Sequence, residues 1–90
     1  MIVMEELLFF FGTECIHCHR MDPLVERLED ELNIKITRLE VWHNEQNARV
    51  QTQLDKGFCG GVPFFFNKKT GKWVCGETTY ENLRKWALGK

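Results

Sequence analysis

The chain carries a C-x-x-C pair in the stretch GTECIHCHRMDP, residues 12–23, where Cys15 and Cys18 stand three positions apart. Two thiols at this spacing can close a disulfide, exchange it with another disulfide, or share a metal ion. With His19 the same residues also match C-x-x-C-H, the attachment signature of c-type haem. The elements that position the pair decide among these chemistries.

The pair lies where a buried strand turns into a helix. EELLFFFG is a continuous apolar run that ends at Gly12, which is typical of a strand covered on both faces. From Cys15 to Leu32, apolar residues recur at helical spacing, with Pro23 inside the pattern and Asn33 as its stop. The first turn of a helix has unpaired N–H groups and the positive end of the dipole, so it stabilises a thiolate. C-x-x-C cysteines in such places have a pKa of roughly 3.5–7.5, against ~8.5 for a free cysteine.

This position predicts thiol–disulfide exchange with a division of roles. Cys15, nearer the helix end and more exposed, is the predicted nucleophile, and Cys18 resolves the mixed disulfide. His17 lies between them, where its ring can stabilise the Cys15 thiolate. The neighbouring carboxylate of Glu14 acts in the opposite direction if it approaches the sulfur. We therefore take Cys15, Cys18 and His17 as the catalytic candidates.

Composition and charge exclude several classes of protein. Ninety residues with 43% hydrophobic and 12% aromatic content predict a single domain over residues 1–90. The formal net charge of −1 gives no basic surface, so we expect no nucleic-acid partner. The longest apolar run, Leu7 to Phe11, is five residues long, against ~20 for a membrane span. Glu5 and Glu6 stand where a secretory signal is basic, so we expect a cytoplasmic monomer without a membrane partner.

The remaining elements follow from alternation, caps and turns: a strand in NIKITRLEVW, a helix over residues 44–56 that ends at Gly57, a hairpin of GVPFFF and KWVC around NKKTG, and a last helix that ends at Gly89. We expect the second strand to be irregular at Thr37–Arg38, and Thr78 with Glu81 to form a capping box. The predicted fold is α/β, in the order β-α-β-α-β-β-α, with a four-stranded mixed sheet between helices.

Beyond the cysteines, the sequence resembles the thioredoxin superfamily. Pro23 follows Cys18 by five residues, as in the active-site helix of thioredoxins, and EVWHNEQNARVQTQLDKGFCGGVPFFFNKKTGKWV resembles the family's second strand, helix, Gly-Val/Ile-Pro loop and hairpin. The resemblance implies a thioredoxin-like fold with Pro63 in a cis peptide bond against the active-site disulfide. It also implies that the main chain of Val62 pairs with an extended substrate and that Gly61 leaves room for it.

The sequence departs from both main branches of that superfamily. The run T-E-C-I-H-C stands where thioredoxins have a W-C-G-P-C-type site, and Phe9 replaces their buried, proton-accepting Asp. The central His17 resembles the C-P-H-C of periplasmic disulfide-forming oxidants. Against glutaredoxins, Gly61-Val62-Pro63 replaces Thr-Val-Pro, and residues 75–78 match the glutathione-clamping turn only in part. The resemblance implies an enzyme that acts on protein disulfides without a cofactor and takes electrons from a reductase or glutathione; a glutathione-dependent, glutaredoxin-like reductase is the alternative.

Cys59 and Cys75 leave three possibilities open. Cys59 lies four residues before Pro63, so the predicted fold brings it toward the active-site face, while Cys75 ends the last strand. The two can form a second disulfide, complete a metal site with the first pair, or be buried thiols. Because free cysteine is among the most buried residue types, we favour buried thiols.

Three other functions compete with thiol–disulfide exchange. Haem attachment, with His19 as axial ligand, is disfavoured because the methionines offer no convincing distal ligand. A zinc or iron–sulfur site would add ligands to the C-x-x-C pair from Cys59, Cys75, His17, His19 or His43; no second C-x-x-C or H-x-x-x-H motif occurs. An interaction module that presents GVPFFF and Trp42 is disfavoured because these aromatic residues fit core strand positions.

Overall fold

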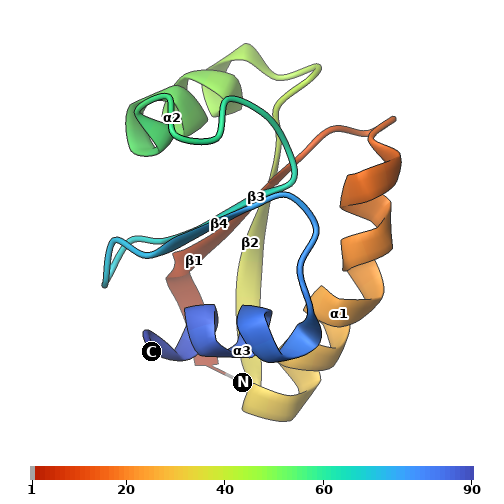
Figure 1. Ribbon diagram of the computed structural model, residues 1–90, viewed down its shortest axis with the longest axis vertical. Helices are drawn as coiled ribbons and strands as arrows, with labels where there is room; N and C mark the ends of the chain where they lie inside the picture. The colour runs from red at the N-terminus through yellow and green to blue at the C-terminus, as the bar shows by residue number, and fades with distance from the viewer. Residues whose placement is uncertain (1) are drawn as a thin grey trace.

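The computed structural model describes residues 2–90, with side chains from Glu6 onward, so Met1 lies outside the described residues. Within this range the elements are β1 (Ile2–Phe11), α1 (Ile16–Leu32), β2 (Ile34–Glu40), α2 (Glu45–Asp55), β3 (Phe64–Asn67), β4 (Trp73–Cys75) and α3 (Tyr80–Leu88), as Figure 1 shows. The predicted order β-α-β-α-β-β-α is confirmed. No helix within residues 2–90 has the length and apolar character needed to cross a bilayer.

The described strands form a four-stranded mixed sheet in the order β2-β1-β3-β4. The strand β1 runs parallel to β2 and antiparallel to β3, and β3 and β4 form the predicted hairpin. The register passes from Met4 opposite Ile36 to Leu8 opposite Thr37, so the extra residues lie in β1. The irregularity expected at Thr37–Arg38 therefore lies opposite those residues, as predicted, but the extra residues belong to β1 and not to β2. A break in alternation marks the level of a bulge and does not say which partner carries the extra residues.

Helices cover both faces of the sheet, as predicted. Phe9 and Phe65 face α1 and α3, while Phe10 and Phe64 lie in a second cluster with Leu54 of α2. Figure 1 shows α1 and α3 on one side of the sheet and α2 on the other. These four phenylalanines are 0% exposed, and each contributes roughly 1.5–3 kcal/mol through burial. The central strands β1 and β3 are thus packed against helices on both faces, and β1 leads directly into the C-x-x-C pair.

Caps fix the helix ends, and two differ from expectation. The helix α1 ends at Asn33 in the left-handed conformation, as predicted, and contains Pro23. The helix α2 ends at Lys56 (φ 55°), one residue before the predicted Gly57. The cap of α3 is Thr79 rather than Thr78, because the side chain of Thr79 accepts a hydrogen bond from the Asn82 N–H. Two adjacent threonines give the same sequence signal, and only the start of the helix distinguishes them.

Candidate active site

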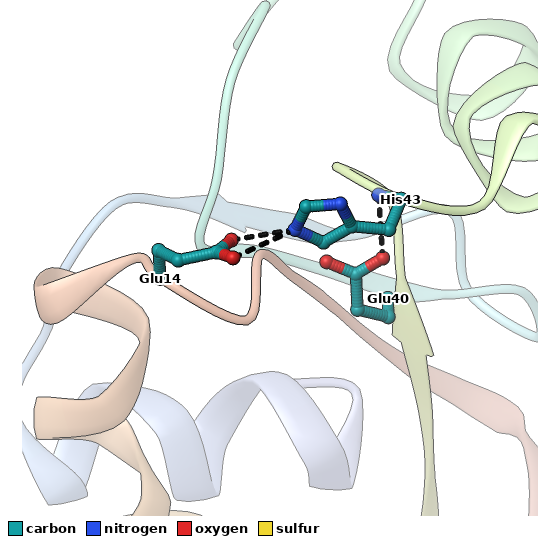
Figure 2. Close-up of side chains that lie close together, drawn as sticks. All are labelled: Glu14, Glu40 and His43. Carbon is teal, nitrogen blue, oxygen red and sulfur yellow. Dashed lines mark hydrogen bonds and ion pairs between the residues drawn. The ribbon is translucent and has the colours of Figure 1, made fainter.

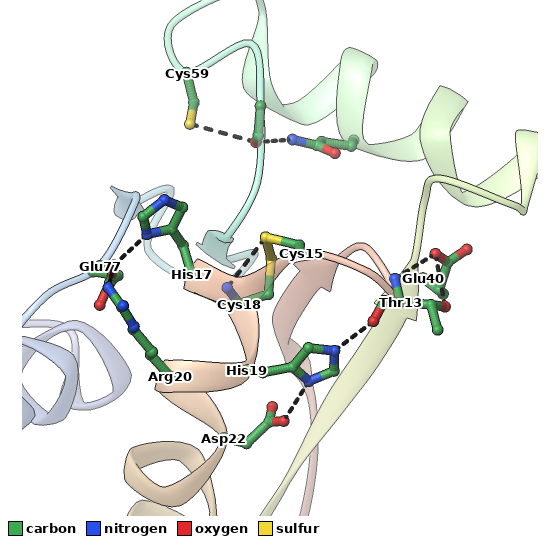
Figure 3. The surroundings of a disulfide bond; sticks show 12 residues. Thr13, Cys15, His17, Cys18, His19, Arg20, Asp22, Glu40, Cys59 and Glu77 are labelled. Atoms are coloured by element: carbon green, nitrogen blue, oxygen red, sulfur yellow. Dashed lines mark hydrogen bonds and ion pairs between the residues drawn. A yellow bond between two sulfur atoms is a disulfide. The ribbon is translucent and has the colours of Figure 1, made fainter.

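The C-x-x-C pair occupies the N-terminus of α1, directly after the β1 strand. Cys15 is the N-cap residue, and its Sγ accepts a hydrogen bond from the Cys18 N–H at 3.1 Å. The two cysteines form a disulfide with Cα atoms 5.2 Å apart (Figure 3). The turn is closed by the Cys15 N–H, which donates to the Gly12 carbonyl at 3.0 Å. A sulfur thus takes the place that a serine or aspartate oxygen fills in most helix caps.

This arrangement favours a negative charge on the Cys15 sulfur once the disulfide is reduced. The Cys18 N–H already points at the sulfur, and the dipole of the 17-residue helix places its positive end there. Exposure separates the two cysteines, since Cys15 is 5% exposed and Cys18 is 0% exposed. Cys15 is therefore the slightly more exposed of two buried cysteines.

His17 projects from the first turn of α1 toward the loop that follows β4. Its Nδ1 lies 2.5 Å from Oε2 of Glu77, and Arg20 lies 3.5 Å from the same carboxylate (Figure 3). The hydrogen bond from His17 lowers the pKa of Glu77 from its ordinary value, and the Arg20 charge adds to this. Among the described residues, Glu77 is therefore the partner of His17, a role that the sequence alone did not suggest because 60 positions separate them.

His19 faces the other flank of the helix and is held at both ring nitrogens. Its Nε2 lies 2.5 Å from the Thr13 carbonyl, and its Nδ1 lies 3.0 Å from the Asp22 carboxylate. The hydrogen bond to Thr13 and then that to Asp22 raise the pKa of His19. With both nitrogens bound, the ring is not free to ligate iron, which argues against the haem interpretation.

Glu14, Glu40 and His43 form a polar cluster (Figure 2), and Glu14 directly precedes Cys15 in the chain. The His43 Nε2 lies 2.7 Å from Oε1 of Glu14, and the His43 N–H donates to Glu40 at 2.8 Å. The hydrogen bond to Glu14 and the charge of that carboxylate raise the pKa of His43. Glu40 also accepts from the Thr13 N–H at 2.9 Å, so it anchors the turn before Cys15. The structure thus places His43 with two carboxylates rather than with the cysteines that the sequence had grouped it with.

The loop before β3 brings the predicted substrate-binding residues to the same end of the sheet. The Val62–Pro63 peptide bond is cis, and the Pro63 carbonyl accepts from the Gly76 N–H at 2.8 Å. Val62 is half-buried and packs against the cluster that contains both active-site cysteines. Gly61 is exposed, and a Cβ added there would meet no atom of the described chain within 4 Å. An open groove of about 270 Å³ is lined by Gly60, Gly61 and Val62 of this loop, and Trp42 also lines it.

Cys59 and Cys75 form a second disulfide, with Cα atoms 5.5 Å apart. The favoured expectation of two buried thiols is wrong, since Cys75 is exposed and Cys59 is half-buried. The pairing follows from the hairpin, because the register sets Cys75 opposite Phe64, directly after Pro63. Burial statistics for free cysteine do not apply to a cysteine that topology supplies with a partner.

Comparison with known proteins identifies the fold. No protein-family model matches the chain, and no curated protein matches it. Among solved structures, a glutaredoxin from Archaeoglobus fulgidus is 20% identical, with a TM-score of 0.69, over 96% of this chain and 89% of its own. A mutant thioredoxin from Halobacterium salinarum is 24% identical, with a TM-score of 0.66, over 92% of this chain and 68% of its own. Methanoredoxin from Methanosarcina acetivorans is 15% identical, with a TM-score of 0.64, over 99% of this chain and 90% of its own.

The chain therefore has a thioredoxin-like fold. The C-x-x-C pair stands at the start of α1 on this fold and is closed as a disulfide in the structure. The identities to the solved structures are low, so the activity has to be argued from the site itself.

Proposed function

We propose that this protein is a thiol–disulfide oxidoreductase that exchanges its Cys15–Cys18 dithiol with disulfides of protein substrates. The observation that carries the proposal is the cap geometry: the Cys15 sulfur accepts the Cys18 N–H at the positive end of α1 and is bonded to the Cys18 sulfur. A sulfur in this position is a stabilised thiolate when reduced and a good leaving group when oxidised.

The reaction needs only the two cysteines and a substrate disulfide. The Cys15 thiolate attacks one substrate sulfur, a new S–S bond forms, and the other substrate sulfur leaves as a thiolate. The deprotonated Cys18 then attacks the Cys15 sulfur, and the first substrate sulfur leaves with the second electron pair. The pair ends as the disulfide, and a donor with two thiol equivalents restores the dithiol.

His17 acts on this reaction through charge. When protonated, the ring stabilises the Cys15 thiolate, and Glu77 holds the ring in place through the bond to Nδ1. Phe9 stands where thioredoxins, by the resemblance, carry a buried aspartate; its ring stacks on Phe65 at 4.7 Å and is 0% exposed. A buried carboxylate is thus missing at that position, which leaves His17 as the ionisable side chain within the C-x-x-C motif.

The protein substrate binds along the loop before β3. The half-buried Val62 offers its main-chain groups to an extended segment, in the manner of an added strand. The open surface around Gly61 and the groove that Trp42 lines leave room for that segment. Pro63 is buried and fixes the end of the loop against the hairpin.

Insulin reduction tests the proposal. The reduced protein should cleave the insulin disulfides and turn over with thioredoxin reductase and NADPH, or with glutathione, as the donor. The Cys15→Ser variant should lose this activity, and a Lys69→Ser variant in the hairpin turn should keep it. If a protein with an intact C-x-x-C pair reduces no insulin with either donor, the proposal is contradicted and a metal-binding or interaction module is favoured.

The second candidate is a glutathione-dependent reductase of the glutaredoxin type. The observation that favours it is the position of Glu77, whose carboxylate lies beside His17 and so beside the C-x-x-C pair. A carboxylate there can pair with the ammonium group of glutathione. Turnover with glutathione but not with the reductase would select this candidate.

A further inference from the structure

We propose that the Cys59–Cys75 disulfide is a second redox site, a clamp on the substrate-binding loop that low-molecular-weight thiols such as glutathione open. The consequence for catalysis rests on the proposed function, whereas the chemistry of the clamp does not. Opening the bond detaches the segment 59–61 from β4, leaves it held by α2 alone, and weakens the binding of protein substrates without changing the reactivity of Cys15.

Buried side chains of α2 hold the loop from one side. Asp55 is 4% exposed and accepts hydrogen bonds from the N–H groups of Cys59 and Gly60, both at 2.6 Å. Gln51 is 8% exposed, and its side chain donates to the Gly61 carbonyl at 2.7 Å. The main chain of three consecutive loop residues is therefore fixed to one helix.

The hairpin holds the same loop from the other side through a weaker set of contacts. Phe58 stacks on Trp73 of β4 with ring centres 5.7 Å apart, but the two rings are 68% and 41% exposed. Water competes for an exposed stack, so the stack alone does not fix the loop. The Cys59–Cys75 bond is the covalent link between the loop and β4, and it starts three residues before Val62.

The clamp is accessible to a small thiol. Cys75 is exposed at the end of β4, which is the edge strand of the described sheet, while Cys59 is half-buried. A thiolate attacks the Cys75 sulfur, the S–S bond breaks, and Cys59 leaves as a thiolate that takes up a proton. A second thiolate attacks the sulfur of the small thiol in the mixed disulfide, the bond to Cys75 breaks, and Cys75 leaves as a thiolate that takes up a proton. The two small thiols end as an oxidised dimer, so two electrons have passed to the clamp.

The reduced form has a hydrogen-bond partner for the half-buried sulfur. The Cys59 Sγ lies 3.5 Å from the Gly61 carbonyl, as the dashed line in Figure 3 marks. A disulfide sulfur has no proton to donate, so this contact becomes a hydrogen bond only when Cys59 is a thiol. The same carbonyl accepts from Gln51, so Gly61 changes its bonding with the redox state of Cys59. The clamp thus couples its own oxidation state to the residue beside Val62.

The first experiment measures the redox state of the clamp and the exchange of the loop amides, without an activity assay. In a Cys15→Ser, Cys18→Ser variant, only Cys59 and Cys75 can change redox state. This protein is equilibrated in reduced or oxidised glutathione, alkylated and analysed by mass spectrometry, and amide exchange is followed at Cys59 and Gly60, whose N–H groups are bound to Asp55. We expect both thiols to be alkylated in the reduced buffer and the loop amides to exchange about ten times faster. A pair that resists excess reduced glutathione, or unchanged exchange after reduction, would overturn the proposal.

The second experiment separates the clamp from the proposed function. With thioredoxin reductase and NADPH as the donor and no glutathione present, so that the clamp of the unsubstituted protein stays closed, a Cys59→Ser, Cys75→Ser variant should show a KM for insulin raised about fivefold, because a smaller fraction of its loops is competent to bind. Its rate with hydroxyethyl disulfide and its Cys15 alkylation midpoint should match those of the unsubstituted protein, as should a Lys69→Ser control. An unchanged KM for insulin contradicts the clamp. If the unsubstituted protein reduces neither substrate, the proposed function is contradicted. In that case, or if the Cys59→Ser, Cys75→Ser variant fails to fold, the amide-exchange experiment alone tests whether the clamp exists.

Discussion

His17 Nδ1 and Glu77 Oε2 lie 2.5 Å apart and join the first turn of α1 to the loop that follows β4. Side chains on both partners are partly exposed, at 60% and 37%. The contact connects the C-x-x-C motif to a segment 60 positions later in the chain, on the flank opposite to His19. A carboxylate from outside the motif thus lies beside the first turn of α1.

Replacing His17 with Gln tests this connection. The pKa of Glu77, lowered by the hydrogen bond from His17, should rise toward its ordinary value of 4.5. The midpoint of Cys15 alkylation should rise by roughly half a pH unit, because the ring that stabilises the thiolate under the proposed function is lost and the Glu77 carboxylate remains. Carboxyl NMR titration and rapid-quench alkylation measure the two effects. His19→Gln is the matched control, and an equal effect from that variant would contradict the assignment.

Stability should depend on pH through His43 and Glu14. The hydrogen bond to Glu14 raises the pKa of His43 above its ordinary value of 6.5. A raised folded-state pKa contributes stability that is complete below 6.5 and is lost as the pH rises through the folded value. Urea unfolding from about pH 6 to about pH 9 should therefore show a Glu14→Gln variant that is weaker than the unsubstituted protein at the acidic end and equal to it at the alkaline end. A difference that grows with pH would refute the pairing.

Substitution by alanine at two glycines near the active site should change the stability of the protein by very different amounts. A Cβ at Gly12 would overlap the ring of Trp42, so Gly12→Ala should displace that ring and destabilise the fold by about 1–3 kcal/mol. A Cβ at Gly61 meets no atom of the described residues within 4 Å, so Gly61→Ala should change stability by less than about 0.5 kcal/mol. Thermal unfolding and tryptophan fluorescence give these values. The Gly61→Ala variant should still raise the KM for insulin, because the added methyl occupies the space of the substrate main chain.

The active-site helix was predictable because its signals are local. The C-x-x-C pair, Pro23 and Asn33 all belong to one helix or its two caps, and each acts on its own turn of backbone. The register break near Thr37 was seen only as a change in alternation, which two paired strands share. Local signals therefore predicted the element order, and errors of one residue arose where two neighbours offer the same chemistry, as at Thr79.

The contacts of the site were less predictable because they join distant segments. Glu77 meets His17 only after the hairpin has placed the loop that follows β4 beside α1. Cys75 meets Cys59 because β4 pairs with β3 in a register that spacing alone does not fix. Asp55 looks like an ordinary acidic residue at the end of a helix, yet it is buried and binds two loop N–H groups. Each of these depends on tertiary placement rather than on a motif.

Asp55→Asn should loosen the loop from the α2 side. The carboxylate accepts from two N–H groups, one at each oxygen, and the amide of Asn would set an N–H₂ group against one of these donors. A buried donor left without an acceptor costs about 1–3 kcal/mol, so urea unfolding should show a loss of that size. The control is Asp30→Asn, an exposed change near the end of α1. Equal stability of the two variants would show that the buried carboxylate does not hold the loop.

The different exposure of the two active-site sulfurs predicts an asymmetric trap. Cys15 is 5% exposed and caps α1, so under the proposed function it should form the mixed disulfide, whereas Cys18 is 0% exposed and should react only with Cys15. The Cys18→Ser variant lacks the sulfur that resolves the intermediate and should accumulate a covalent complex with a protein disulfide, visible on a non-reducing gel. The Cys15→Ser variant, with Cys59 and Cys75 kept as their disulfide, should form none, because the remaining sulfur of the C-x-x-C pair, that of Cys18, is buried. Equal trapping by both variants would reverse or remove the roles assigned here, and a reducing agent must release the complex for the bond to be a disulfide.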